Sequence, residues 1–450
     1  MSVPSPEDRQ SAPAETVPAY QHLALAALMF FATGVFGFLQ PFVPLYQEAA
    51  GLTKDQFGTV VALGTGAALL IQPVLGRLSD RWDRRRPLIV AAAIWAGCAY
   101  LGYRYASGFW MFTALTAAGV NGFQYINAAG GVLAGRLAQM TGQGGGSAYV
   151  RYRVWGSVGY IVVGMTTGLL VNRTLPGTDA LVRADLDPIF TYGPLLFFAI
   201  AVLALFVPDA SSAQIAKAAH TTRTATTVAS AATPAAPPLT TVPAAESEAA
   251  PRDPNLRAFL IAYFLYTFGL YGASSFLPFY MRQLGASPFQ ITGMFSAGVV
   301  CEVLVMAWIG RWSDVYGRRP ALAFSFLLMP LRLLFYIPAN NPQWVMLVQI
   351  LHGINFGIIG TIAVVFVNDL AQPHERGAMQ ARLAATAGSG LALAPLICGW
   401  LAEQFGIRIM FAAMSVVGMA AAGIFMRYVG ESQRDRQVHT NPVVRFLAGK

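Results

Sequence analysis

The feature that most constrains this chain is a succession of apolar stretches, each long enough to cross a lipid bilayer as a helix. About twelve stretches of roughly 20 residues account for most of the sequence. The composition agrees, because 55% of the residues are hydrophobic, 11% are charged and the mean hydropathy is +0.52. Little of the chain is left for a soluble domain, and it contains no Walker phosphate loop or nucleophile elbow. We therefore expect a membrane protein that is not an enzyme.

The apolar stretches fall into two sets of six, with an unusual segment between them. The first set covers residues 22–46, 55–76, 87–105, 109–135, 152–172 and 189–207, and the second covers 257–281, 288–310, 319–337, 343–367, 379–403 and 407–428. Residues 209–256 are rich in Ala, Thr and Pro and poor in large apolar side chains, which predicts a disordered linker. The sequence thus predicts an all-α membrane protein with twelve transmembrane helices in two pseudo-symmetric six-helix bundles, residues 22–208 and 257–430, around a central cavity. Residues 1–21 and 431–450 are expected to be polar tails.

Arginines predict the orientation in the membrane. The alternate loops that are rich in them hold Arg77, Arg81, Arg84, Arg85, Arg86, Arg136, Arg151, Arg153, Arg311, Arg318, Arg319, Arg376 and Arg382. By the positive-inside rule this side is cytoplasmic, so both termini and the linker are expected in the cytoplasm and the chain in the inner (plasma) membrane. The net charge of +9 then reflects topology, and no nucleic-acid partner is expected.

Cysteines give no sign of a disulfide framework or a metal cluster. Cys98, Cys301 and Cys398 lie singly in apolar stretches that are far apart in the sequence. We expect neither a metal nor any other cofactor.

The second half of the chain repeats the first at a constant offset of 234 residues, the separation of Phe42 and Phe276. The recurring pairs are Phe42 and Phe276, Pro44 and Pro278, Tyr46 and Tyr280, Gly51 and Gly285, Gln56 and Gln290, Gly76 and Gly310, Arg77 and Arg311, Ser79 and Ser313, Asp80 and Asp314, Gly119 and Gly353, and Asn121 and Asn355. Because each copy has an even number of spans, both begin on the same side of the membrane. They are parallel repeats about an axis along the bilayer normal.

Two loops at matching positions carry the same signature. Gly76-Arg-Leu-Ser-Asp80-Arg-Trp-Asp-Arg84-Arg85 follows the second span, and Gly310-Arg-Trp-Ser-Asp314-Val-Tyr-Gly-Arg318-Arg319 follows the eighth. Almost the whole chain resembles transporters of the major facilitator superfamily, whose loop signature these copies look like. Within that superfamily, Tyr152–Gly159 and Leu351–Gly357 resemble the branch that contains lactose permease and the nucleoside and phenylpropionate permeases.

The signature loops are expected to act as a gate. Their acids can bind nearby arginines and face a helix N-terminus, whose positive end stabilises an exposed acid by about 0.3 to 1 kcal/mol. The candidate gating residues are Asp80, Arg84, Arg85, Asp314, Arg318 and Arg319. Asp83 stands where the second copy has Gly317, and we expect a left-handed backbone there. The alternative is that these charges only set the topology.

Three ionisable residues fall inside predicted spans of the second half, where charge is costly and marks function. They are Glu302, Arg332 and His352, and their counterparts at the repeat offset are the uncharged Ala68, Cys98 and Ala118. In lactose permease the proton-coupling residues lie in the same three helices, an acid, an arginine and a histidine in that order. The resemblance therefore implies proton coupling by these three residues. It is partial, because Asn355 stands where a second acid is expected. The alternatives are a static salt bridge between Glu302 and Arg332 and a core role for His352.

Uncharged polar and aromatic side chains are the candidates for substrate binding. They are Gln40, Asn121, Gln124, Tyr125, Tyr266, Tyr271, Gln349 and Asn355. Amides supply donors and acceptors and aromatic rings stack on apolar faces, which suits a hydroxylated or heteroaromatic solute. Polar contacts between helices are the alternative. A separate stripe, Gly156, Gly159, Gly164 and Gly168, predicts a close helix crossing with a structural role.

These patterns favour a secondary active transporter that takes up a small polar organic solute, such as a sugar, a nucleoside or an aromatic acid, together with protons by alternating access. Its expected partners are that solute, protons and the bilayer, and the protein is expected to be a monomer. The first alternative is a proton-coupled antiporter that exports drugs or metabolites. The Gly-Pro pair that marks such antiporters is missing from the fifth span, which favours uptake. The second alternative is a membrane sensor that transports nothing.

Overall fold

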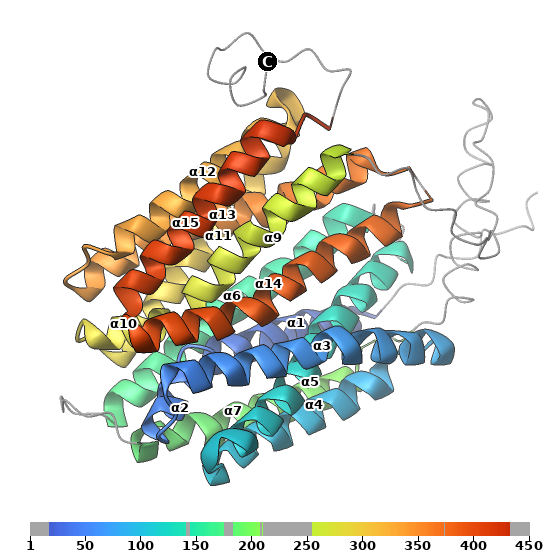
Figure 1. Ribbon diagram of the computed structural model, residues 1–450. Helices are drawn as coiled ribbons and strands as arrows, with labels where there is room; N and C mark the ends of the chain where they lie inside the picture. The colour runs from blue at the N-terminus through green and yellow to red at the C-terminus, as the bar shows by residue number, and fades with distance from the viewer. Residues whose placement is uncertain are drawn as a thin grey trace, which may run out of the picture.

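The computed structural model describes residues 18–140, 145–174, 183–207, 209, 254–372 and 374–432, and helices account for most of them. In the first half they are α1 (Ala19–Leu39), α2 (Val43–Ala49), α3 (Lys54–Trp82), α4 (Arg86–Gly102), η2 (Tyr103–Tyr105), α5 (Gly108–Met140), α6 (Gly145–Thr174) and α7 (Arg183–Ala204). In the second half they are α9 (Pro254–Ser275), α10 (Leu277–Gln283), α11 (Pro288–Tyr316), α12 (Arg318–Tyr336), α13 (Pro342–Leu370), α14 (Arg376–Gln404) and α15 (Ile407–Tyr428). Figure 1 shows the two halves as two bundles of long helices.

Every predicted transmembrane range coincides with a helix. Within the described residues, 11 helices are long and apolar enough to cross a membrane. The twelfth member of the predicted set, α5, is 33 residues long. Polar side chains in its middle, Asn121, Gln124 and Asn127, lower its hydropathy. The helix content and the two bundles agree with the predicted all-α architecture.

Several elements extend beyond the apolar stretches that predicted them. The helix α3 continues to Trp82 and α11 to Tyr316, past predicted ends at 76 and 310. Apolar character marks the part of a helix that lies in lipid, whereas the backbone hydrogen bonds continue into the polar residues that follow.

The bundles also include residues that the sequence assigns to the linker and the tails. Asp209 contacts α4, α9 begins at Pro254, α1 begins at Ala19, and Glu431 contacts α12. The remainder of the predicted linker and tails lies outside the described residues.

The structure gives the internal repeat a physical meaning. Tyr46 and Tyr280 occupy equivalent positions in the short helices α2 and α10. Each hydroxyl donates to a backbone carbonyl at the end of the third spanning helix of its bundle. Tyr46 donates to the carbonyl of Tyr103, which follows α4 (3.3 Å), and Tyr280 donates to that of Tyr336, which ends α12 (2.7 Å). The repeated residues therefore tie each short helix to its own bundle in the same way.

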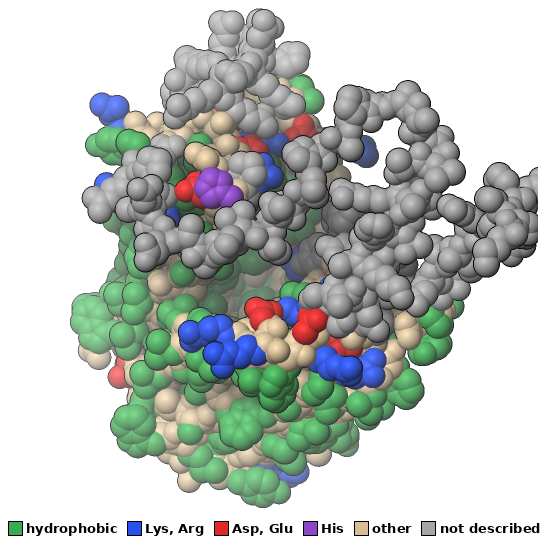
Figure 2. All heavy atoms as spheres, turned by 90° about the vertical axis from the view of Figure 1, so that its right-hand side faces the viewer, with side chains coloured by type: hydrophobic (Ala, Val, Ile, Leu, Met, Phe, Trp, Pro, Cys, Tyr) green, Lys and Arg blue, Asp and Glu red, His purple; other side chains and the backbone are tan. Residues whose placement is uncertain are grey.

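The bundles touch near one end of the helices. At the end formed by α2 and α10, which we call the far end, the ring of Phe57 in α3 packs against Phe276 and Phe279, with centroids 5.4 and 5.2 Å apart. On the other side of this interface Gly168 of α6 lies against Thr292 of α11. The end with the α3–α4 and α11–α12 loops, the signature end, is hollowed between the two halves (Figure 2). The molecule is closed at the far end and open at the signature end.

The glycine stripe of α6 forms the close crossing that the sequence predicts. Gly156 lies against Thr33 and Gly159 against the carbonyl of Phe30, both in α1, while Gly168 contacts α11. A side chain at Gly159 would overlap the backbone of α1, so these positions set the separation of the two helices.

We expect Gly159→Ala to destabilise the protein by about 1 to 3 kcal/mol, because the added methyl group forces α1 and α6 apart. Thermal unfolding of the detergent-purified variant measures the loss. Gly423→Ala in α15 is the matched control, since a Cβ there meets open space among the described atoms. Equal unfolding temperatures for the two variants would contradict a close crossing at Gly159.

Candidate functional site

Glu302 lies in the middle of α11 and is partly exposed. The backbone around it packs against Gly353 and Gly357 of α13, which support α11 within the second bundle. The residues close enough to interact with its carboxylate electrostatically are Arg153 and Tyr160 of α6 and Tyr271 of α9. A cation and a phenol of the first bundle therefore lie within electrostatic range of an acid of the second.

Arg332 binds His352 in this conformation. It is fully buried in α12, and its guanidinium donates to Nδ1 of His352 in α13. A ring nitrogen that accepts a hydrogen bond from arginine carries no proton. None of the ion pairs found among the described residues joins Glu302 to Arg332. The static salt bridge between those two residues is therefore absent from this part of the chain in this conformation.

Three predicted substrate-binding residues are buried inside the second bundle. The hydroxyl of Tyr266 bonds to a serine hydroxyl of α12 (2.8 Å), and Gln349 accepts a hydrogen bond from Tyr336 (2.9 Å). Asn355 is 0% exposed, and both polar atoms of its side chain lack a partner among the described atoms. In this conformation the three are packed between helices, and their role in substrate binding stays a prediction. Tyr271 is partly exposed.

Near Glu302 the first bundle presents aromatic and amide side chains. Phe36 of α1 is 39% exposed and stacks on Phe123 of α5 with centroids 4.9 Å apart. The hydroxyl of Tyr160 donates to Oε1 of Gln40 (2.7 Å), which leaves the amide nitrogen of Gln40 as a donor for another group. Gln124 is also partly exposed. Gln40 and Gln124 therefore lie on accessible surface, as the sequence predicts for a binding site.

The two other candidates of this bundle are buried elsewhere. Asn121 is 5% exposed, and its backbone carbonyl accepts a hydrogen bond from Gln72 of α3 (2.9 Å). Tyr125 is 4% exposed and lies beside Ser79 and near Arg85 of the first signature loop. Both side chains are buried within the bundle in this conformation, and contact of Asn121 and Tyr125 with the substrate stays a prediction.

The first signature loop forms ion pairs within its own bundle. Nη2 of Arg85 lies 2.7 Å from Oδ1 of Asp80, and Nη2 of Arg136 lies 3.0 Å from Oδ1 of Asp83. Asp83 has the expected left-handed backbone, with φ at 48°. Arg84 is exposed, and the side chain of Asp80 is 71% exposed. In this open conformation Asp80 is still accessible to a further partner.

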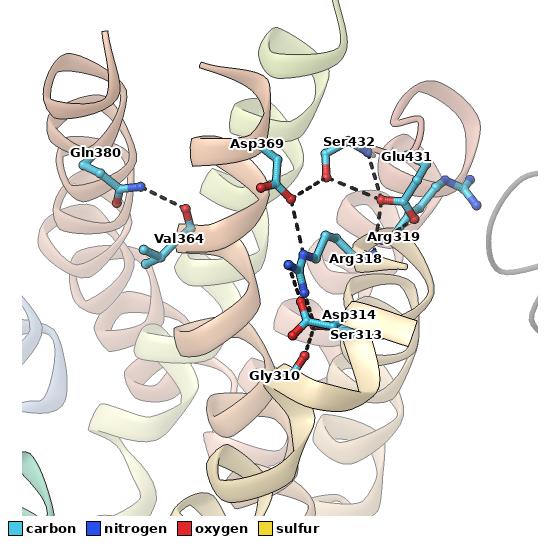
Figure 3. A network of polar contacts seen from close by, with 10 residues as sticks. All are labelled: Gly310, Ser313, Asp314, Arg318, Arg319, Val364, Asp369, Gln380, Glu431 and Ser432. Atoms are coloured by element: carbon cyan, nitrogen blue, oxygen red, sulfur yellow. Dashed lines mark hydrogen bonds and ion pairs between the residues drawn. The ribbon is translucent and has the colours of Figure 1, made fainter. Parts of the chain in front are cut away.

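The second signature loop also forms ion pairs within its own bundle, but through Arg318, the counterpart of the exposed Arg84 (Figure 3). Arg318 binds Asp314 at 2.6 Å and reaches Asp369 of α13 at 3.3 Å. Gly317 also has a positive φ, 103°, but its ψ of 160° differs from the 23° of Asp83, so the positive φ recurs at the equivalent position in a different turn. Arg319 donates to two backbone carbonyls near the end of α15, including that of Met426 (2.8 Å). Five of the six residues named for gating thus join helices within each bundle. They are Asp80, Arg85, Asp314, Arg318 and Arg319.

In each bundle an acid that follows the last helix, α7 or α15, caps the N-terminus of the third spanning helix, α4 or α12. Oδ2 of Asp209 accepts from the backbone N–H of Arg86 (3.1 Å), and Glu431 accepts from those of Arg318 (3.2 Å) and Arg319 (3.0 Å; Figure 3). Carboxylates at a helix N-terminus satisfy free N–H groups and the helix dipole. Both acids lie beyond the predicted bundle ends, so periodicity gave no signal for them.

Arg153 is the other residue that sequence reasoning missed as a site candidate. The sequence analysis places it at the edge of a span beginning at 152, among loop arginines. The helix α6 begins at Gly145, two turns earlier, so Arg153 lies inside the helix. The antiparallel neighbour α11, in contact with α6 through Thr292 and Gly168, carries Glu302 to a similar depth.

Comparisons with known proteins agree with this architecture. Residues 22–413 match the family model described as the MFS_1 like family. An uncharacterised MFS-type transporter of Mycobacterium tuberculosis is 26% identical over 448 residues, which cover 96% of this chain and 98% of that protein. The multidrug resistance efflux pump PmrA of Streptococcus pneumoniae is 26% identical over 166 residues, 35% of this chain and 40% of the pump.

Solved structures of transporters share the fold. The nucleoside transporter NupG superposes with a TM-score of 0.68 at 15% identity, over 91% of this chain and 98% of its own. The xylose transporter XylE from Escherichia coli, in an inward open conformation, gives a TM-score of 0.65 at 15% identity, over 92% of this chain and 96% of its own. The predicted fold, twelve helices in two bundles, is confirmed by these likenesses.

Proposed function

Because this chain belongs to the MFS_1 like family and is a transporter of the major facilitator superfamily, we propose that it takes up a small polar organic solute together with protons by alternating access. The placement of Glu302 is the observation that carries this proposal. It is an acid within a membrane-spanning helix, and it lies where two bundles that must move relative to each other face one another.

The proton step follows from what surrounds Glu302. Arg153 belongs to the other bundle, so movement of the bundles changes the distance between the acid and this cation. An opposite charge nearby stabilises the carboxylate, and its withdrawal into an apolar environment stabilises the protonated acid. Glu302 would therefore bind a proton in one conformation and release it in the other. Arg332 and His352 act in this scheme as a buried pair that supports α13 behind Glu302.

We place the open signature end on the cytoplasmic side. The arginine-rich loops support this orientation by the positive-inside rule, and a structural relative of similar shape is described as inward open. The conformation is then inward-facing, with both ends of the chain in the cytoplasm.

The solute is proposed to bind between Glu302 and the partly exposed groups of the first bundle. Phe36 and Phe123 offer a ring-stacking surface, and Gln40 and Gln124 offer hydrogen bonds. Tyr271 approaches from α9. These groups suit a nucleoside, a sugar or an aromatic acid.

A ligand panel tests the proposal. The purified protein is heated with nucleosides, sugars, aromatic carboxylates and cationic drugs, and a compound that raises the unfolding temperature is then used for uptake into proteoliposomes. We expect a neutral or acidic member of the panel to stabilise the protein and to accumulate when the outside is made acidic. Stabilisation by cationic drugs alone, with no accumulation of the other classes, would contradict the proposal.

Proton-coupled efflux is the second candidate. Its support is the similarity to multidrug pumps over about a third of the chain. The same vesicle assay separates the two functions, because an antiporter accumulates its solute when the vesicle interior is acidic.

We expect Asp80→Asn and Asp314→Asn to favour the open signature end by about twofold to fivefold. When this end closes, the exposed Asp80 approaches the N-terminus of α14, and a neutral side chain loses that attraction. Labelling of Gln124→Cys from the signature side measures the balance, with Asp55→Asn at the far end of α3 as control. Unchanged labelling in both variants would reduce the signature to a topology signal.

A further inference from the structure

Four charged residues form a chain across the far end, two from each bundle. Oε2 of Glu48 lies 2.9 Å from Nη1 of Arg282, and its Oε1 lies 3.7 Å from Nζ of Lys54. Lys54 in turn lies 3.9 Å from Oε2 of Glu403, which also accepts its backbone N–H (3.0 Å). Glu48 and Lys54 belong to the first bundle, and Arg282 and Glu403 belong to the second. The charges alternate in sign, and two of the three links join different bundles.

The link between Glu48 and Arg282 lies where the two repeats meet. The two residues are 234 positions apart, the offset of the internal repeat, and they occupy equivalent places in the short helices α2 and α10. A pair of equivalent positions that touch must lie on the pseudo-twofold axis. Separation of the bundles at this end therefore breaks this pair whichever side of the interface opens first.

The second link exists on one side of the interface only. The repeat counterpart of Lys54 is Pro288 and that of Glu403 is Leu169, neither of which carries a charge. There, α6 and α11 meet through Gly168 and Thr292. The α3–α14 side thus adds a charged link to a close helix contact, in which Gly399 lies against the backbone of Lys54, whereas α6 and α11 meet through small and apolar residues.

Solvent reaches the charged chain without any movement of the bundles. A cavity of about 400 Å³ is lined by Glu48, Ala49, Phe279, Arg282 and Gln283. The four side chains are between 21% and 33% exposed. Ion pairs of this kind are weak and are screened by salt, which suits a contact that must break in every transport cycle.

We propose that Arg282, Glu48, Lys54 and Glu403 form an ionic gate that holds the far end closed while the signature end is open. The proposal rests on the alternating access of the proposed function, but it is independent of proton coupling and of the solute. The gate biases the conformational balance without locking it. Each partly exposed bridge changes that balance by about 1.4-fold to fivefold.

A reporter at the seam tests the gate without a substrate. Thr292→Cys places a thiol at a position that is 1% exposed and contacts Gly168, in a background with Cys98, Cys301 and Cys398 replaced by serine. The probe is an uncharged, membrane-impermeant maleimide added from the far side. Its reaction rate reports how often the far end opens.

Loss of either charge of the pair between Glu48 and Arg282 should make the far end open more often. Glu48→Gln and Arg282→Gln should each raise the labelling rate about twofold to fivefold. In a Lys54→Gln background, which removes the cation beside Glu48, the exchanged pair Glu48→Arg with Arg282→Glu should return the rate close to that of the background. The matched control is Asp55→Asn, whose carboxylate accepts from Thr53 in its own loop. The unmutated gate should also open more often at about 1 M salt, and the variant with both Glu48→Gln and Arg282→Gln should respond less, because only the bridge between Lys54 and Glu403 is left to be screened.

Labelling that is unchanged in both neutral variants would overturn the gate, and so would an exchanged pair that stays as open as the single variants in the same background. Circular dichroism and gel filtration confirm that each variant is folded before labelling. Failure of Glu302→Gln to uncouple transport would count against the proposed function and leave the labelling result standing. The two proposals therefore fail separately.

Discussion

Glu302→Gln is expected to abolish accumulation of the solute against its gradient and to leave exchange of labelled for unlabelled solute intact. Glutamine has the shape of the protonated acid but cannot release a proton, so the bundles can still alternate around a bound solute. With one proton per solute, a gradient of about one pH unit drives about tenfold accumulation. In the Glu302→Gln variant the internal concentration of the solute should only equal the external one. Uptake into proteoliposomes with and without the pH gradient measures both activities, using a compound that stabilises the unmutated protein.

The control for this experiment is Glu375→Gln, an acid in the α13–α14 loop outside the proposed pathway. It should accumulate solute as the unmutated protein does. Tenfold accumulation by Glu302→Gln would remove Glu302 from the coupling step and leave it as a residue that only positions α11 against α6.

Arg153→Gln is expected to reduce gradient-driven uptake by about tenfold or more. It removes the cation of the first bundle that faces Glu302, and a carboxylate without that partner in apolar surroundings is strongly disfavoured. The acid would then keep its proton in both conformations. Arg153→Lys retains the charge without the planar fork and should keep part of the activity.

Initial rates of uptake under a pH gradient measure the effect of Arg153→Gln. The control is Arg257→Gln, an exposed arginine near the start of α9. If Arg153→Gln transports at the rate of this control, the cation facing Glu302 has no part in coupling, and the link between the bundles must lie elsewhere.

The fold was predictable because a helix that crosses the bilayer requires a long apolar stretch, which is easily recognised in the sequence. Long apolar stretches gave the helices, and the 234-residue offset gave two equivalent bundles. The offset also located a shared backbone feature, since Asp83 and Gly317 both have a positive φ. Such features are local, and a short motif specifies them.

The site was predicted less well because helix faces depend on packing. Tyr266 and Asn355 are polar and sit in the middle of spans, but both point into the second bundle and are fully buried. A span of uniformly apolar residues does not reveal which face meets lipid, a neighbouring helix or the pathway. The contact between Arg332 and His352 on the neighbouring α13 depends on helix packing in the same way, because the two residues are 20 positions apart in the sequence.

The residues that sequence reasoning missed act across long separations. Glu48 and Arg282 occupy equivalent positions in the two repeats but have opposite charges. A comparison of identical residues therefore does not reveal them. Glu403 meets Lys54 only after both bundles have formed. Such contacts follow from the tertiary structure and from no local pattern.

Movement of protons with the solute tests the central claim most directly. A pH-sensitive dye is trapped in proteoliposomes that contain the unmutated protein, and a stabilising compound of the panel is added outside with no imposed pH gradient. We predict that the interior acidifies as the solute enters, and that Glu302→Gln vesicles show no such change. Entry of the solute with constant internal pH would contradict proton coupling, and an interior that becomes alkaline would show exchange of solute for protons in place of symport.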